Sequence, residues 1–235
     1  MNQPKVAVVT GGAGALGRVI VGEFLRGGYA VAIPHHAGSG ANPAPLPFES
    51  DPGVMLRPAD LRSETDVDHF MRSVAEELGP VHSLVHAAGG YAGGSPVEEL
   101  PTDEWDRMIA MNLTTCFLMC RAALRQMRAA GRGRIVTVAA MPAIVPSARK
   151  AAYAVSKRGV ASLTEQIAEE TRGSGITANA IAPSVILTEA NLRAMPGADS
   201  AQWVTPEEIA RLSFYLCSDD ARSISGNVIR IFGGV

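Results

Sequence analysis

The sequence predicts a single α/β domain built on a doubly wound, seven-stranded parallel sheet that helices cover on both faces. Short β-branched runs alternate with longer helical patterns along the whole chain, and 47% of the 235 residues are hydrophobic while 19% are charged. Sustained strand–helix alternation implies right-handed crossovers and therefore a parallel sheet. Because the chain has no internal repeat and no linker between domains, we expect residues 1–235 to form one domain around a large core.

The elements follow in order from local patterns. Residues 5–10 form a continuous apolar run, which is typical of a strand buried on both faces. A helical stripe over 18–26 ends at Gly27 and Gly28. Further strands are expected at 29–34, 54–57, 83–87, 134–139, 176–181 and 227–232. Further helices are expected at 63–78, with Ser63 as N-cap, and at 102–130, 151–171 and 206–216.

Two stretches interrupt the alternation. Residues 37–53 are rich in Gly, Pro, Ala and Ser and are expected to form a mobile loop. Residues 185–204 are long enough to be a functional lid over a substrate, and Leu192, Met195 and Trp203 suggest that this lid has an apolar wall.

Composition excludes several classes of protein. The net charge of −2 offers no basic excess for a nucleic-acid partner, and 5% aromatic residues supply few stacking platforms. No apolar run is long enough to span a membrane, and the N-terminus lacks a signal-peptide pattern, so we expect a cytoplasmic protein. Cys116, Cys120 and Cys217 lack metal-ligand spacing; we expect no metal site, and interpret them as buried small hydrophobic residues in a reducing compartment.

A glycine-rich turn at 10–17 joins the first expected strand to the first helix. Glycines permit positive φ and let backbone N–H groups approach a pyrophosphate, which then lies at the helix N-terminus. A tight turn that needs no ligand is the alternative. The position after a buried strand, at the start of an alternating chain, favours a Rossmann-type dinucleotide site.

Several ordered motifs resemble those of the short-chain dehydrogenase/reductase family over essentially the full chain. The turn at 10–17 resembles TGxxxGxG, with Ala15 at the position of the middle glycine, and Asp60 stands at the position of the adenine-contacting aspartate. Residues 86–89 stand where the family has NNAG, with both asparagines lost, and Asn112 stands at the position of the helix asparagine. Tyr153 and Lys157 match YxxxK, and residues 183–188 match PGxxxT.

The resemblance implies an NAD(P)(H)-dependent oxidoreductase that transfers hydride between the nicotinamide and a small-molecule substrate. It makes Tyr153 the general acid/base, lets Lys157 hold the ribose, and assigns a water in the proton relay to Asn112. Four residues apart on a helix, Tyr153 and Lys157 share a face, so the ammonium is expected to lower the pKa of the tyrosine. The implied cofactor-binding residues are Gly11, Gly14, Leu16, Gly17, His35, His36, Asp60, Ala88, Gly89, Lys157, Pro183, Val185 and Thr188.

The resemblance also implies a homodimer or homotetramer that pairs through the helices carrying Asn112 and Tyr153. Alanine-rich faces on these helices allow close approach, although they equally fit helix-on-sheet packing. The alanines concerned are Ala122, Ala123, Ala151, Ala152 and Ala161.

One catalytic group of the family is missing. Its serine, thirteen residues before the tyrosine, hydrogen-bonds the substrate carbonyl oxygen, and that position is Ala140 here. Losing one such donor typically costs about 10²–10³ in rate. Three explanations are open: another donor such as Ser147 or Ser184 replaces the serine, the substrate needs no such donor, or the chain is no longer an enzyme.

A narrower resemblance bears on this choice. Residues 89–94, residues 187–199 and Trp203 are similar to loops of the quinonoid dihydropteridine reductases, a branch of the family that keeps the Tyr/Lys pair and has alanine in place of the serine. A quinonoid or C=N substrate takes hydride without building an alkoxide. Reduction of such a group is therefore a hypothesis beside reduction of a carbonyl.

The end of the second strand favours NADP(H) over NAD(H), although this one feature is all that distinguishes them. NAD-preferring members carry an acidic residue where this chain has His35, and His36 stands where NADP-preferring members often have arginine. Arg18 or Arg57 could assist in holding a 2′-phosphate.

Two other functions remain open. Loss of the serine and of both NNAG asparagines favours a nucleotide-binding partner or sensor that reduces nothing, whereas retention of Tyr153, Lys157 and Asn112 opposes it. A dehydration or isomerisation that uses the tyrosine without net hydride transfer is the third possibility.

Overall fold

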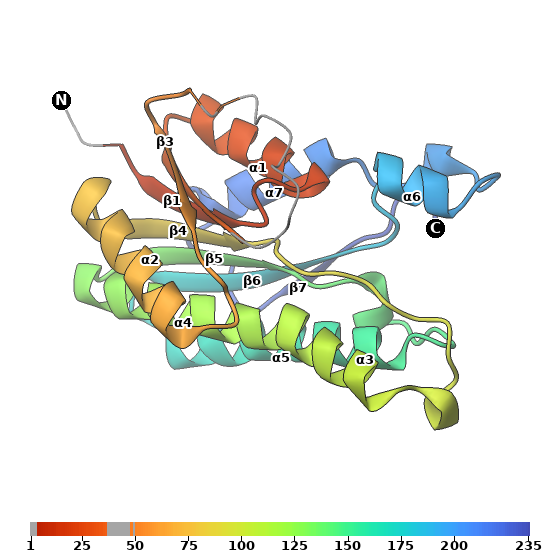
Figure 1. The fold of residues 1–235 in the computed structure, drawn as a ribbon. Helices are drawn as coiled ribbons and strands as arrows, with labels where there is room; N and C mark the ends of the chain where they lie inside the picture. Colours follow the sequence, from red (N-terminus) through yellow and green to blue (C-terminus); the bar gives the residue numbers. More distant parts are fainter. Residues whose placement is uncertain (1–3, 37–47, 49) are drawn as a thin grey trace.

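A computed structural model describes residues 4–36, 48 and 50–235, and within them the chain forms a seven-stranded, all-parallel sheet in the order β3-β2-β1-β4-β5-β6-β7 (Figure 1). The strands are β1 (Val6–Thr10), β2 (Ala30–His35), β3 (Val54–Pro58), β4 (Val81–His86), β5 (Gly133–Val138), β6 (Ile176–Pro183) and β7 (Val228–Ile231). This confirms the predicted fold class, with strand ends that differ from the expected ones by at most two residues.

Helices cover both faces of the sheet. They are α1 (Ala15–Arg26), α2 (Glu64–Glu77), α3 (Thr102–Met108), α4 (Thr115–Ala130), α5 (Ala151–Glu170), α6 (Glu189–Ala194) and α7 (Pro206–Cys217). Figure 1 shows α1 and α7 over one face, and α2, α4 and α5 over the other. The chain order of the strands reverses between β1 and β4, which places a topological switch point at the centre of the sheet.

Two of the expected helices differ in detail. Helix α1 begins at Ala15, three residues earlier than expected. It directly follows the N-cap residue Gly14, whose backbone is extended (φ −78°, ψ 172°). The stretch expected as one helix over 102–130 contains a π-helical segment, Ile109–Thr114, between α3 and α4. Such single-turn widenings occur often at functional sites.

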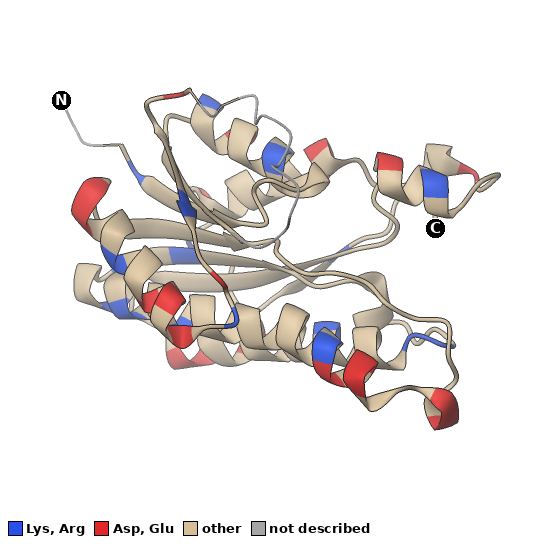
Figure 2. Cartoon of the chain, viewed as in Figure 1, with Lys and Arg blue, Asp and Glu red and all other residues tan. Residues whose placement is uncertain are grey.

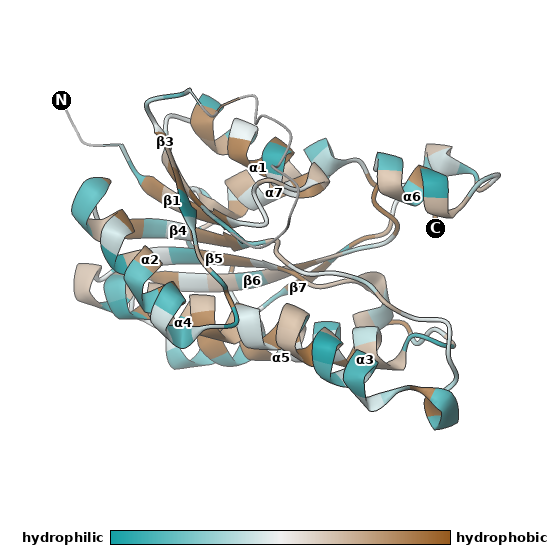
Figure 3. Ribbon diagram, in the orientation of Figure 1, coloured by the Kyte–Doolittle hydropathy of each residue, from teal (hydrophilic) through white to brown (hydrophobic). Residues whose placement is uncertain are grey.

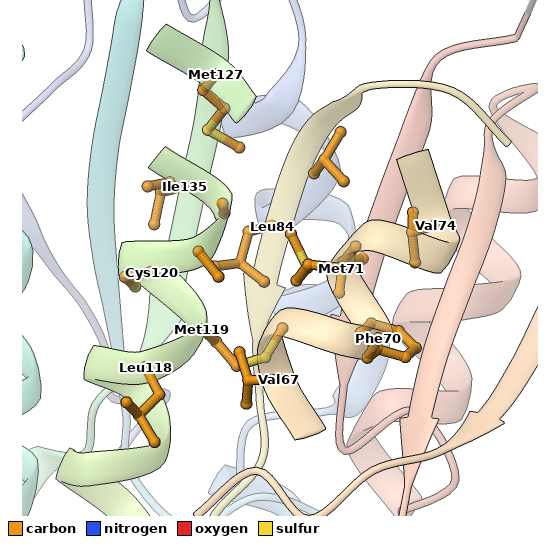
Figure 4. Close-up of a cluster of buried hydrophobic side chains, with 14 of the residues drawn as sticks. Val67, Phe70, Met71, Val74, Leu84, Leu118, Met119, Cys120, Met127 and Ile135 are labelled. Carbon is orange, nitrogen blue, oxygen red and sulfur yellow. The ribbon is translucent and has the colours of Figure 1, made fainter. Parts of the chain in front are cut away.

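The strands separate two hydrophobic clusters because successive side chains point to opposite faces. Val6 and Val8 of β1 pack with α2 and α4, in the cluster of Figure 4, whereas Ala7 and Val9 pack with α1 and α7. Every residue of β1 is buried, which explains why the strand is a continuous apolar run rather than an alternating one. Figure 3 shows the same concentration of hydrophobic residues along the central strands.

Side chains and glycines fix several helix ends as predicted. The Ser63 hydroxyl accepts a hydrogen bond from the Asp66 N–H (3.3 Å), which confirms the N-cap of α2. Gly131 ends α4 in the left-handed conformation, with φ 66°. At α7, Thr205 and Glu208 form a reciprocal capping box, which satisfies two N–H groups at the start of the helix.

Residues 185–204 contain α6 and a β-bridge between Ile186 and Val204. Of the three residues expected to form an apolar wall, Leu192 and Met195 are exposed and Trp203 is buried. The bridge draws the residues beside Val204 into the core. The expected mobile loop at 37–53 falls mostly on 37–47 and 49, which lie outside the described residues.

The helix alanines pack within the chain itself. Ala122, Ala123, Ala152 and Ala161 are buried within the single chain, and Ala151 is half-buried. Cys116, Cys120 and Cys217 are buried free thiols, as expected.

Charged side chains of both signs are interspersed on the outer helices (Figure 2). Across the described parts of the chain, no helix is long and apolar enough to cross a membrane. Nor do the residues described gather three His, Cys, Asp or Glu side chains into a potential metal site.

Candidate active site

A cavity of about 750 Å³ opens at the carboxyl ends of the strands, beside the switch point between β1 and β4. This is where ligands bind in open α/β sheets. Its lining is formed by Gly11, Ala13, Pro34, His35, His36, Ala59, Asp60, Leu61, Arg62, Ala88, Gly89, Asp106, Arg107, Ala110, Met111 and Thr115. The structure thus brings together six residues that were predicted to hold a cofactor: Gly11, His35, His36, Asp60, Ala88 and Gly89.

The glycine-rich turn is shaped by close backbone approach. Gly11 has φ 69°, and a Cβ there would lie 2.9 Å from the Ala88 nitrogen. A Cβ at Gly17 would overlap the Gly11 carbonyl oxygen, so this position also requires glycine. The Gly14 N–H donates to the Gly11 carbonyl (2.8 Å), while Leu16 packs partly against the core beneath α1.

The N-terminus of α1 fits an anionic phosphate group. Gly14 provides no side-chain cap, and the first turn of α1 carries no acidic residue, so its N–H groups remain available. Arg18 donates from Nη2 to the Ala13 carbonyl (3.1 Å), but its buried Nε has no hydrogen-bond partner. An unpaired guanidinium nitrogen beside a glycine cradle is a ready donor for a phosphate.

At the far end of the cleft, the Asp60 carboxylate is held by Arg62. Arg62 Nε lies 3.0 Å from Asp60 Oδ1 and Nη2 lies 2.8 Å from Oδ2. Mainly through these bonds, the pKa of Asp60 is lowered to about 2. Arg62 was missed at the sequence level, although its spacing two residues after Asp60 could have indicated the pair.

His35 and His36 also line the cleft. Arg57, which was a candidate helper, instead pairs with Glu77 (2.9 Å) across α2. Arg57 is not among the residues that line the cleft, and the Glu77 carboxylate holds its guanidinium.

Asn112 and Lys157 lie together behind Gly89. Asn112 is buried in the π-helical segment, accepts a hydrogen bond from the Gly90 N–H (2.9 Å) and donates to Ser156 Oγ (3.0 Å). Lys157 Nζ donates to the Val138 carbonyl (2.8 Å), and burial lowers its pKa to about 8. A Cβ on Gly89 would lie 2.5 Å from Asn112 Oδ1 and 3.2 Å from Lys157 Nζ, so backbone, amide and ammonium converge.

Tyr153 departs from the expected electrostatics. Burial, and next the Tyr91 phenol, raise its pKa to about 12, whereas the sequence predicted a lowered pKa. The two side chains share a helix face, but the Lys157 ammonium is directed to the Val138 carbonyl, and the desolvation of Tyr153 therefore dominates. The Tyr153 backbone carbonyl accepts a hydrogen bond from Ser156 Oγ (2.8 Å), which ties it to Asn112.

Ala140 occupies the second position after β5, in extended conformation, and is buried. Ser184, one candidate replacement donor, gives its hydroxyl to the Phe232 carbonyl (2.8 Å). Ser147 lies half-buried in the loop before α5. Neither serine shows a hydrogen bond to Tyr153 among the described residues.

Sequence reasoning overlooked His86, the residue at the first NNAG position. It is buried, with Nδ1 3.0 Å from Thr10 Oγ1 and Nε2 3.5 Å from Thr115 Oγ1. Thr115 donates its own proton to the Met111 carbonyl (2.7 Å), so Nε2 carries the imidazole hydrogen and Nδ1 accepts from Thr10. Burial, with a smaller effect of the Lys157 charge, lowers the pKa of His86 to about 3. This neutral histidine links the glycine-rich turn to the π-helical segment.

Three further predicted residues, Pro183, Val185 and Thr188, lie at and after the end of β6 and are not among the residues that line the cavity. Pro183 ends that strand, and Val185 accepts a hydrogen bond from the Val204 N–H (3.0 Å). The Thr188 hydroxyl caps α6 by accepting from the Asn191 N–H (3.2 Å). These contacts fix the start of the 185–204 segment.

The fold and the glycine-lined cleft define a Rossmann-type nucleotide-binding domain. The family model for the short chain dehydrogenases matches residues 5–197, and the chain belongs to the short-chain dehydrogenase/reductase family of oxidoreductases.

Among similar proteins, D-threitol dehydrogenase of Mycolicibacterium smegmatis is 34% identical, covering 98% of this chain and 92% of the relative. D-beta-hydroxybutyrate dehydrogenase of Rhizobium meliloti is 30% identical, covering 98% of both chains. A short-chain dehydrogenase/reductase structure from Mycobacterium ulcerans superposes with a TM-score of 0.91 at 25% identity, covering 99% of this chain and 90% of that chain. The structure of ElxO with NADP bound, at 24% identity and a TM-score of 0.91, covers 98% of each chain and supports the fold alone.

Proposed function

We propose that this protein is an NAD(P)(H)-dependent oxidoreductase that transfers hydride between a nicotinamide and a small-molecule substrate. The observation that carries the proposal is the convergence of Asn112, Lys157 and the Gly89 backbone at one end of the cavity that begins at the glycine-rich turn. When bound, the nicotinamide supplies or accepts the hydride. Gly11, Gly14, Gly17 and the α1 N-terminus would hold the pyrophosphate, and Lys157 the ribose.

Tyr153 is the general acid/base in this proposal. With its pKa raised to about 12, its hydroxyl stays protonated at neutral pH and can donate a proton to the reduced substrate atom. Asn112 fixes the Gly90 backbone and, through Ser156, the backbone carbonyl of Tyr153. These contacts hold the backbone of the proposed acid at a fixed position relative to the cleft. Lys157 places a buried positive charge beside Gly89.

For the substrate we propose a conjugated C=N or quinonoid group, with a simple carbonyl as the alternative. Ala140 supplies no hydroxyl beside β5, and Ser184 is already bonded to Phe232. A site with one proton donor suits a substrate whose reduction spreads charge over a conjugated system rather than building an alkoxide. The similarity to D-threitol dehydrogenase and to D-beta-hydroxybutyrate dehydrogenase supports the carbonyl alternative.

We further propose NADP(H) as the preferred cofactor. The imidazoles of His35 and His36 line the cleft, and the Asp60 carboxylate is neutralised there by Arg62. The local charge therefore does not repel a 2′-phosphate. Initial rates with NADPH and NADH at equal concentration test this, and a clear NADH preference contradicts it.

The decisive test of the mechanism is Tyr153→Phe. Turnover, followed by the absorbance of the reduced nicotinamide, is expected to disappear while the cofactor Kd, measured by fluorescence titration, stays unchanged. Tyr215→Phe, an exposed tyrosine on α7, is the matched control and should keep wild-type turnover. Unchanged turnover in Tyr153→Phe rejects the mechanism.

A nucleotide-binding sensor or partner subunit is the second candidate, and the absent hydroxyl at Ala140 favours it. It predicts tight NADP(H) binding with no consumption of NADPH by any carbonyl, imine or quinone. A dehydratase or isomerase would instead form product from its substrate while the nicotinamide absorbance stays constant.

We also propose a cytoplasmic homodimer or homotetramer. Three free thiols suit a reducing compartment, and Phe117 on α4 and Val155 on α5 are exposed apolar residues on the pair of helices that would meet. Sedimentation velocity tests the assembly, and a monomer at high micromolar concentration contradicts it.

A further inference from the structure

Tyr91 is an exposed aromatic residue that lies directly against the proposed acid. Its side chain is 60% exposed, yet its ring meets the Tyr153 ring edge-to-face, with centroids 5.0 Å apart and planes at 81°. Burial on folding cannot account for a tyrosine that remains so accessible, because little of its apolar surface leaves water. An aromatic surface held open beside a reactive group is instead available to a ligand.

The loop that carries Tyr91 is anchored to the start of α5. The Gly94 N–H donates to the Arg149 carbonyl (2.8 Å), and Arg149 Nη1 reaches back to the Gly94 carbonyl (3.4 Å). Within the described part of the chain, Arg149 is the one non-glycine residue with positive φ (60°). A non-glycine residue in that conformation is strained and persists only where its surroundings enforce it.

Two glycines of this loop bring its backbone close to the Tyr91 side chain and to Met111. A Cβ on Gly93 would lie 2.9 Å from the Tyr91 hydroxyl oxygen and 2.8 Å from the Arg149 carbonyl oxygen. A Cβ on Gly90 would lie 2.5 Å from Met111 Sδ, a residue that lines the cofactor cleft. The ring is therefore placed by close contacts on its own loop and by Tyr153, and it is preorganised without being buried.

We propose that Tyr91 contacts the substrate and determines specificity, with its ring forming an aromatic wall beside Tyr153 that selects planar, conjugated substrates over aliphatic ones. A rigid aromatic ring offers a large contact area at small entropic cost, and a planar π-system gains from stacked or edge-on contact in a way that a saturated chain does not. This inference rests on the proposed oxidoreductase function and names the substrate class of the same site.

The test compares two substrate probes with NADPH: phenanthrenequinone as the planar conjugated probe and acetoacetate as the aliphatic ketone. Tyr91→Leu is expected to raise KM for phenanthrenequinone about tenfold while changing KM for acetoacetate less than about twofold. Tyr91→Phe keeps the ring and should behave as wild type. Tyr215→Leu, which removes an exposed tyrosine from α7, should leave both KM values unchanged.

A second variant moves the ring without removing it. Gly93→Ala is expected to displace Tyr91 and raise KM for phenanthrenequinone in the same direction, with wild-type circular dichroism and an unchanged Kd for NADPH. An equal loss on both probes in Tyr91→Leu, or no loss on either, overturns the proposal.

Failure of the proposed function looks different. If wild-type protein consumes no NADPH with either probe, phenanthrenequinone binding to the NADPH-loaded protein is measured by fluorescence quenching. A Kd that rises about tenfold in Tyr91→Leu then supports the aromatic wall in a protein that is not a reductase. A Kd that Tyr91→Leu does not change overturns the wall as well.

Discussion

Replacing His86 by asparagine tests the buried hydrogen-bond chain that links the glycine-rich turn to the π-helical segment. Because its surroundings hold His86 neutral and lower its pKa to about 3, the folded chain binds no proton there at mildly acidic pH. The unfolded chain, in which the imidazole has its ordinary pKa of 6.5, does bind one. The free energy of unfolding therefore falls as pH drops below about 6.5, and above that pH the titration has no effect.

The magnitude follows from the two pKa values. Each pH unit between them corresponds to about 1.4 kcal/mol, so lowering the pH from about 7.5 to about 5 should cost about 2 kcal/mol through His86 alone. Asparagine can accept from Thr10 and donate toward Thr115 without titrating. In His86→Asn this part of the acid destabilisation disappears, even if the variant is less stable throughout because the smaller side chain leaves space.

Urea unfolding at several pH values between 7.5 and 5 measures the effect as a difference in slope. The other titrating groups, including buried His82 with its pKa lowered to about 4 by desolvation, remain in both proteins and cancel in the comparison. His69→Asn, on the exposed side of α2, is the control and should keep the wild-type slope. Equal slopes in wild type and His86→Asn would refute a buried neutral histidine.

Three further outcomes are expected. Ala140→Ser should raise the steady-state turnover of acetoacetate by about 10-fold or more, because the new hydroxyl can act as an oxyanion donor, and should change the turnover of phenanthrenequinone by less than about twofold. No gain on acetoacetate would contradict the view that a hydrogen-bond donor is missing at this position. Gly17→Ala should destabilise the fold by at least about 2 kcal/mol in urea and abolish NADPH binding, because its Cβ overlaps the Gly11 carbonyl oxygen; wild-type binding would disprove the tight turn. Thr205→Ala should lower the free energy of unfolding by about 1 kcal/mol through loss of the α7 capping box, while Thr205→Ser should restore most of it.

The fold was predictable because its signals are local. A strand buried on both faces, such as β1, has a continuous apolar sequence. Ser63 and Gly131 fix the ends of the helices next to them. The short helix α6 within 185–204 was not expected, and the π-helical segment within the expected helix 102–130 gave no local sign. It coincides with the Asn112 side chain reaching Gly90 and Ser156, which are contacts made across the fold.

The positions of the site residues could be predicted from sequence motifs. Their pKa values and hydrogen-bond partners could not, because these depend on how the chain packs around them. The spacing of Tyr153 and Lys157 correctly placed both on α5, but the pKa of Tyr153 depends on its burial and on Tyr91, and it moved opposite to the expectation. Asp60 was found, but its partner Arg62 was not. The sequence could not show that Trp203 is buried while Leu192 and Met195 of the same segment are exposed.

A parallel α/β domain with a glycine-rich turn before its first helix could be predicted from the sequence, and so could the positions of Asn112, Ala140, Tyr153 and Lys157 along the chain. These features depend on backbone conformation and on side-chain spacing over a few residues. The tertiary structure alone decided which groups lose water and which meet: His86 between Thr10 and Thr115, and the Tyr91 ring against Tyr153. Desolvation and contact between residues far apart in sequence set the charge state of a side chain and its access to substrate, and both arise only when the layers pack.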